Sequence, residues 1–129
     1  MKHARRMGIA SLLLILLVTA VVAGAGTAPA GAAGTKVKRV NIKDFAFAPR
    51  TITVKAGTKV TWKNADSFAH RLASTDSMKT TAKITRMFKS GLLSAGERFS
   101  FKFRKKGTFY YECTIHASTA SMHGKVIVK

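Results

Sequence analysis

The chain has 129 residues and carries 23 Lys and Arg residues against 5 Asp and Glu residues, a formal net charge of +18 at pH 7. Hydrophobic residues make up 47% of the chain and aromatic residues 9%, which excludes a wholly disordered protein and suffices for one hydrophobic core. The single cysteine excludes an internal disulfide. We therefore expect one domain that folds without covalent cross-links.

The N-terminal region has the order of a secretory signal peptide. Three basic residues within the first six positions precede an apolar run over 9–23, and small residues with Ala-x-Ala-like cleavage sites follow over 24–33. The run is shorter than the roughly 20 residues that a membrane-spanning helix needs. We predict a signal peptide over 1–30, a flexible linker over 31–36 and one domain over 37–129. The alternative is an uncleaved segment that anchors the chain to a membrane.

The charge persists beyond the predicted signal peptide. Three of the 23 basic residues lie within it, so the remaining chain has 20 basic and 5 acidic residues and a net charge of +15. Such a field attracts acidic proteins, anionic lipid headgroups or cell-wall polymers. The predicted export, to the periplasm or the extracytoplasmic cell surface, argues against nucleic acid. Contact with a membrane is expected only through an uncleaved signal or through peripheral electrostatics.

Alternation of apolar and polar residues predicts short β-strands along the domain. The expected strands are 37–42, 51–54, 59–63, 69–73, 97–103, 109–113 and 125–129. The clearest is ERFSFKF, in which Phe99, Phe101 and Phe103 share one face. Residues 74–87 are polar and basic, and we expect a long loop or one helical turn there. Seven or eight short strands in about one hundred residues predict an all-β sandwich.

The segment YECTIHASTASMHG (111–124) gathers several metal donors around the only cysteine. Cys113 ends a predicted strand, and His116 and Met122 follow before the last strand begins. A loop between two strands can therefore direct all three side chains to one point. His70, which follows another strand, is the candidate for a fourth donor.

A thiolate, two imidazoles and a thioether form an informative ligand set. A trigonal site of two histidines and one cysteine, with a weak axial methionine, is the blue-copper arrangement used in electron transfer. Zinc is less expected, because structural zinc sites seldom use a thioether and usually have more cysteines. A cysteine nucleophile paired with histidine is a further alternative, but the sequence indicates neither a cleft nor a supporting Asn or Asp.

Taken together, these motifs resemble the cupredoxins of the plastocyanin, amicyanin and pseudoazurin type. The resemblance covers about 37–129 and is carried, in order, by VTWKNADSFAH (60–70), FKSGLLSAGERFSFKF (88–103), GTFYYECTIH (107–116) and MHGKVIV (122–128). It implies a Greek-key β-sandwich that binds one copper ion at one end. It maps the ligands onto His70, Cys113, His116 and Met122.

The resemblance also implies a function. The protein is expected to be an exported, monomeric blue-copper protein, not an enzyme, that passes one electron at a time to an acidic redox partner or works at an anionic cell-surface component. His116 would be the ligand nearest the surface. Two features depart from close relatives: five residues separate His116 from Met122, and Arg71 follows His70 where Asn, Thr or Ser is common. These departures favour the alternative of copper storage, delivery or sensing without electron traffic.

Other residues near these motifs have simpler interpretations. His123 is expected to face solvent beside the metal ligands. Trp62 and Tyr111 are expected in the core. The basic run at 104–106 is expected to form a solvated turn, with a docking patch as the alternative.

Overall fold

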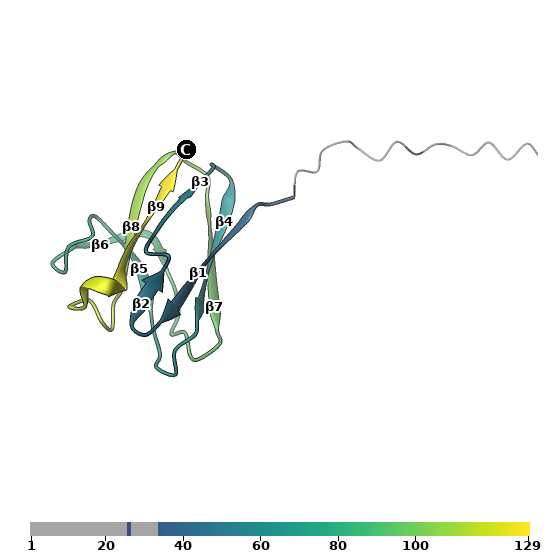
Figure 1. Cartoon of the computed structure of the whole chain (residues 1–129). Helices are drawn as coiled ribbons and strands as arrows, with labels where there is room; N and C mark the ends of the chain where they lie inside the picture. Colours follow the sequence, from purple (N-terminus) through teal and green to yellow (C-terminus); the bar gives the residue numbers. More distant parts are fainter. Residues whose placement is uncertain (1–25, 27–33) are drawn as a thin grey trace, which may run out of the picture. The chain divides into compact units, whose positions relative to one another are not determined.

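The computed structural model describes Gly26 and residues 34–129. The strands are β1 (Val37–Lys43), β2 (Ala46–Ala48), β3 (Thr51–Val54), β4 (Thr58–Asn64), β5 (Leu72–Thr75), β6 (Ile84–Lys89), β7 (Arg98–Phe103), β8 (Gly107–Cys113) and β9 (His123–Val128), with one short 3₁₀ turn, η1 (Ala120–Met122) (Figure 1). Within the described residues, no helix has the length and apolarity needed to cross a membrane. The predicted signal peptide and most of the predicted linker lie outside the described residues.

The strands form two sheets that face each other. One sheet has the order β2-β1-β4-β7 and the other the order β3-β9-β8-β5-β6 (Figure 1). The β1–β4 and β3–β9 pairs are parallel, and the remaining pairs are antiparallel. This arrangement confirms the predicted all-β sandwich, with nine strands in the described part of the chain instead of seven or eight.

The loop predicted at 74–87 is present only over 76–83, because β5 extends to Thr75 and β6 occupies Ile84–Lys89. The alternation that marks other strands is missing from β6, since Phe88 is its only buried residue. Backbone pairing and Ser74 hold this edge strand in place. The Ser74 hydroxyl accepts hydrogen bonds from the amides of Met87 and Phe88, both at 3.1 Å. Edge strands of this kind carry little hydrophobic signal.

The core is aromatic and lies between the two sheets. Trp62 and Tyr111 are fully buried, as predicted, and their rings meet edge to face with centroids 5.2 Å apart. Phe99 stacks on Trp62 at 5.8 Å, and Phe103 is fully buried behind it. Aromatic pairs at such spacings add to the free energy gained from burying their surface. The predicted phenylalanine stripe of β7 therefore serves packing and positions the strands that lead to the functional site.

Candidate metal centre

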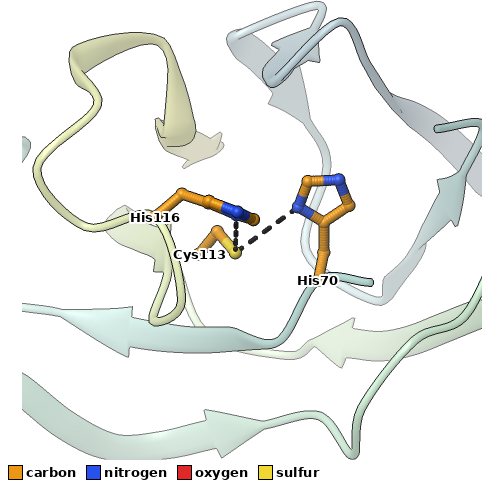
Figure 2. A group of neighbouring side chains, drawn as sticks. All are labelled: His70, Cys113 and His116. Carbon is orange, nitrogen blue, oxygen red and sulfur yellow. Dashed lines mark hydrogen bonds between the residues drawn. The ribbon is translucent and has the colours of Figure 1, made fainter. Parts of the chain in front are cut away.

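Three of the predicted ligands, His70, Cys113 and His116, meet at one end of the sandwich (Figure 2). Cys113 is the last residue of β8, and a turn closed by His116 N–H donating to the Cys113 carbonyl at 3.1 Å returns His116 to the thiol. His70 comes from the other side, in an isolated bridge with Leu93. The Cys113 Sγ lies 3.5 Å from His70 Nδ1 and 3.4 Å from His116 Nδ1.

These separations suit donors that share a small metal ion. Bonds of about 2.3 Å to sulfur and 2.0 Å to nitrogen, at tetrahedral to trigonal angles, separate the two donors by about 3.5–3.7 Å. All three donor atoms lie within 4.8 Å of one another. His70 and Cys113 are fully buried, whereas His116 is only partly buried. A buried thiol between two imidazole nitrogens is a donor set for copper, because it combines soft and borderline ligands.

Asp66 fixes the orientation of His70. His70 Nε2 donates to the Asp66 carboxylate at 2.9 Å, which leaves Nδ1 as a free donor atom pointing at Cys113. A carboxylate that holds the outer nitrogen of a metal-binding histidine sets its tautomer and raises its basicity. Burial raises the pKa of Asp66, but hydrogen bonds from the Phe45 and Asp44 amides and from His70 outweigh this and lower it below its usual value. Asp66 is therefore ionised at neutral pH.

The same carboxylate orders a neighbouring turn. Asp44 N and Phe45 N donate to Asp66 at 2.6 and 3.2 Å, and both residues have a positive φ of 52°. Residues other than glycine adopt this conformation only when their surroundings hold them there. The turn directs the Phe45 ring toward the site, where it meets His116 edge to face at 5.0 Å and His70 at 5.9 Å. One acidic residue thus positions a histidine and the aromatic ring that packs beside it.

Asn64 ties together the loops on the His70 side. Its amide nitrogen donates to the carbonyl groups of Phe68 at 2.7 Å and Leu93 at 2.9 Å, and its side-chain oxygen accepts from Asp66 N at 2.9 Å. Asn64 is fully buried, and its bond to Leu93 is protected from water. The loop that carries His70 and Asp66 is therefore fixed from inside the protein.

Backbone atoms support the cysteine loop. The Thr114 amide donates to the Arg71 carbonyl at 2.8 Å. This bond depends on the main chain at position 71, so the arginine side chain there does not prevent it. The sequence departure at Arg71 leaves the link between the His70 and Cys113 loops intact.

Side chains also hold the long segment between His116 and Met122. Arg50 donates through Nη2 to the Ala120 carbonyl and through Nε to the His123 carbonyl, both at 2.8 Å. Ser121 Oγ donates to the Phe45 carbonyl at 2.6 Å. Together with η1, these bonds give the extra residues of the loop a defined conformation.

The prediction that His123 faces solvent is wrong, because its side chain is fully buried. His123 Nε2 donates to the Ala117 carbonyl at 2.6 Å, and its Nδ1 lies 3.5 Å from the Glu112 carboxylate, across the β8–β9 pair. Burial raises the pKa of Glu112, and His123 partly offsets that rise. The loop that begins at Ala117 turns back over His123, so this histidine joins β9 to the ligand loop.

Met122, the fourth predicted ligand, is fully buried at the end of η1. It belongs to the same hydrophobic cluster as Cys113, and its amide donates to the Thr119 carbonyl at 2.9 Å.

The environment of His116 also suits a metal ligand. Burial and the nearby His70 lower the pKa of His116, against an opposing effect of Asp66. The imidazole is therefore neutral at pH 7, the form that can bind a metal.

Sequence reasoning did not find Asp66, Phe45 or Arg50. The sequence Asn64-Ala65-Asp66 carries a signal for the first of these, because Asn and Asp after a strand favour side-chain turns. Asp66 also lies four residues before His70. No local pattern points to Phe45 or Arg50, since each contacts residues that are distant in the sequence.

Comparisons with known proteins agree with this geometry. The family model of copper-binding proteins of the plastocyanin/azurin family matches residues 33–129. The chain is 32% identical to amicyanin-alpha of Methylorubrum extorquens, over 79% of this chain and 76% of that protein. It is 36% identical to a chloroplastic plastocyanin of Tetradesmus obliquus, over 64% of this chain and 58% of that protein.

Solved structures give the same result. A purple cupredoxin from Nitrosopumilus maritimus superposes with a TM-score of 0.62 and 28% identity, over 70% of this chain and 98% of that one. A copper-containing nitrite reductase from Thermus scotoductus matches with a TM-score of 0.58 and 26% identity, over 70% of this chain but only 22% of that enzyme. The chain described here belongs to the copper-binding plastocyanin/azurin family, the cupredoxins.

Proposed function

We propose that this protein is an exported, mononuclear blue-copper protein that carries one electron at a time. The observation that supports this most directly is the convergence of the Cys113 thiol on the Nδ1 atoms of His70 and His116, at 3.5 and 3.4 Å. Copper bound by these residues would supply a Cu(I)/Cu(II) couple. Met122, buried in the cluster that contains Cys113, is proposed as the weak axial ligand.

The way the donors are held favours electron transfer. Asp66 fixes His70, β8 fixes Cys113, and the turn closed onto Cys113 fixes His116. A site whose donors are constrained by bonds to the surrounding protein changes little in geometry when its charge changes. Such a site has a small reorganisation energy for each electron transferred. An electron carrier needs this property, whereas a protein that releases metal does not.

His116 offers a route for the electron to the surface. It is the least buried of the three clustered ligands, and the Phe45 ring packs against it with centroids 5.0 Å apart. Ile115, next to it in the chain, is 48% exposed, and Phe68, whose ring lies 5.0 Å from Phe45, is 57% exposed. An apolar rim allows a redox partner to approach His116 without trapping water between the two proteins.

The second candidate is copper storage, delivery or sensing, for which the longer ligand loop is the supporting feature. The bonds from Arg50 and Ser121 argue against a loose loop that opens to release copper. An enzymatic role is not proposed. The described residues hold one cluster of metal-binding side chains, and the similarity to nitrite reductase covers only 22% of that enzyme.

The proposed location is the periplasm or the extracytoplasmic cell surface, and the proposed state is a monomer. The order of basic, apolar and small residues over the first thirty positions supports export. The net charge of +15 after that segment supports an acidic redox partner, with association that weakens as salt concentration rises.

One experiment separates a carrier from a copper-releasing protein. The copper-loaded protein is cycled between its oxidised and reduced forms in the presence of a Cu(I) chelator, and both electron self-exchange and copper loss are measured. We expect fast self-exchange and retention of copper through repeated cycles. Slow self-exchange with transfer of copper to the chelator on reduction would replace electron carriage with copper delivery.

A further inference from the structure

The end of the sandwich opposite the metal centre is strongly basic. This surface, the basic pole, consists of the exposed residues Lys36, Lys55, Lys102, Lys129 and 104–106 (Arg-Lys-Lys). Backbone bonds bring its segments together: Gly57 N donates to Phe103 O at 2.7 Å, Ala56 N to Lys129 O at 3.0 Å, and Lys59 N to Lys36 O at 2.8 Å. Along β8, Gly107 at this end is about 20 Å from Cys113 at the other.

Charge is distributed unequally between the two ends. Among the described residues, the basic pole and the turns that carry it, 54–59 and 102–108, contain no acidic side chain. Every Asp and Glu except Asp76 lies toward the metal centre, as shown by the contacts or chain position of Asp44, Asp66, Glu97 and Glu112. The cations of the pole therefore have no acidic neighbours on the same surface, and they lie at the end of the sandwich away from the copper site.

Two hollows open at or beside the basic pole. One, of about 290 Å³, lies between the chain that enters β1 and the β3–β4 turn, with Lys36, Lys55 and Lys102 around it. The other, of about 360 Å³, has an apolar lining from Met87, Phe101 and Phe109 and cations from 102, 104 and 105. Cations beside an apolar hollow suit an anion that is attached to a hydrocarbon part.

Clustered cations beside an apolar hollow suit a lipid surface better than they suit an acidic protein. Anionic headgroups match the clustered lysines, and the upper acyl chains match the hollow lined by Phe101 and Phe109. Val37, at the start of β1, adds a further exposed apolar side chain at the same end. A soluble acidic polypeptide would satisfy the charges but would leave the apolar hollow in contact with water.

The position at which the chain enters the domain also supports a lipid surface. The chain enters the described domain at Gly34, which lines the hollow beside Lys36. Only ten residues, 24–33, separate the domain from the apolar run at 9–23. Fully extended, that connection reaches at most about 35 Å. The chain therefore joins the domain at the basic pole, so the connection to the apolar run begins at this end of the domain.

We infer that the basic pole is a docking surface for an anionic phospholipid bilayer, and that it leaves the copper-binding end exposed to soluble redox partners. The inference rests on the far end of the sandwich and does not depend on the metal site. A neighbouring basic residue contributes about a fivefold gain in binding to an anionic bilayer, so three such residues contribute about a hundredfold.

The test compares binding of the full chain to vesicles of phosphatidylcholine alone and of phosphatidylcholine with phosphatidylglycerol. The measured quantity is the ratio of the affinity for anionic vesicles to the affinity for neutral vesicles. Any insertion of the apolar run contributes equally to this ratio in every variant. Substitutions K102Q, R104Q and K105Q together remove three charges from the basic pole. Substitutions K43Q, K89Q and R98Q remove three exposed charges elsewhere and keep the net charge matched. Each variant is first checked for an unchanged copper spectrum.

We expect the pole variant to lose the anionic preference about a hundredfold and the matched variant to lose less than about threefold. The preference should also fall as salt concentration rises. Equal losses in the two variants, or none in either, would overturn the inference. An equal hundredfold loss of binding to soluble polyglutamate would assign the pole to an acidic protein instead.

Orientation gives a second readout. An environment-sensitive fluorophore is attached after K105C at the basic pole or after S118C in the exposed ligand loop, and the fully buried Cys113 does not compete for the label. On anionic vesicles we expect a blue shift from position 105 and none from position 118. A shift at position 118 alone would show that the apolar rim of the metal centre, not the basic pole, meets the bilayer.

Discussion

Removal of the Asp66 carboxylate tests how the His70 ligand is prepared for metal. In Asp66→Ala, the Nε2–H of a fully buried His70 loses its acceptor, while the exposed Asp44 amide can turn to water. One buried donor left unsatisfied costs about 1–3 kcal/mol of folding free energy. For a domain of this size that lowers the Tm of the metal-free protein by about 4–8 °C per kcal/mol.

Copper binding should weaken separately. Without the carboxylate, neither the tautomer nor the ring orientation of His70 is fixed, and loss of such an outer partner lowers metal affinity about 10- to 100-fold. This corresponds to about 1.4–2.7 kcal/mol. The affinity is measured by competition with a chelator, followed through the visible copper–thiolate band. Asp76→Ala is the matched control, because Asp76 also accepts a backbone hydrogen bond, from Lys83 N at 3.0 Å, in a turn outside the cluster.

The control should bind copper as the unmodified protein does. If Asp66→Ala binds copper within about twofold of the unmodified protein and keeps its spectrum, the proposed role of the carboxylate in positioning His70 is refuted. Equal losses in the Asp66 and Asp76 variants would show that net charge, not the hydrogen bond to His70, sets the affinity.

Three further predictions follow from the packing and the protonation of the site. Gly124→Ala places a methyl group against the Tyr111 ring and should cost about 1–3 kcal/mol of stability in thermal unfolding. Gly91→Ala is the control and should cost little, because the space around Gly91 is open. Equal costs in the two variants would contradict this prediction. Burial and His70 lower the pKa of His116 in the folded protein, so His116 takes up a proton more readily in the unfolded state. The metal-free protein should therefore lose stability as pH falls below about 6.5. An equally steep loss in His116→Gln would exclude this cause. Met122→Leu should keep the visible band but raise the reduction potential, because a weak axial donor tunes the potential more than it holds the ion. An unchanged potential and spectrum would remove Met122 from the ligand set.

The local part of the site was predictable because its residues are close in sequence. Cys113 and His116 share one turn at the end of a strand, and their spacing alone brings their donor atoms together. His70 could be proposed as a further donor, but its spacing does not show that it meets Cys113, because that approach depends on the bridge to Leu93 and on the pairing of β5 with β8. The aromatic alternation of β7 predicted its inward face correctly because one side of that strand is buried.

The errors have a common physical origin in tertiary structure. His123 was expected in solvent, but the ligand loop that precedes it turns back over its side chain and offers the Ala117 carbonyl. The β6 strand was missed because it buries only Phe88 and is held by hydrogen bonds to Ser74 from another strand. Arg50 is far in sequence from the loop it fixes. Contacts of this kind leave no local periodicity for sequence reasoning to detect.

The central claim is that Cys113, as a thiolate, binds one copper ion together with His70 and His116. It is tested most directly by absorption and EPR spectra of the copper-loaded protein and of Cys113→Ser, each with a measured copper content. We predict one copper per chain with an intense visible band and a single EPR signal, and loss of that band in Cys113→Ser even when copper is still bound. A colourless copper-loaded protein, or a band that survives in Cys113→Ser, would contradict the account.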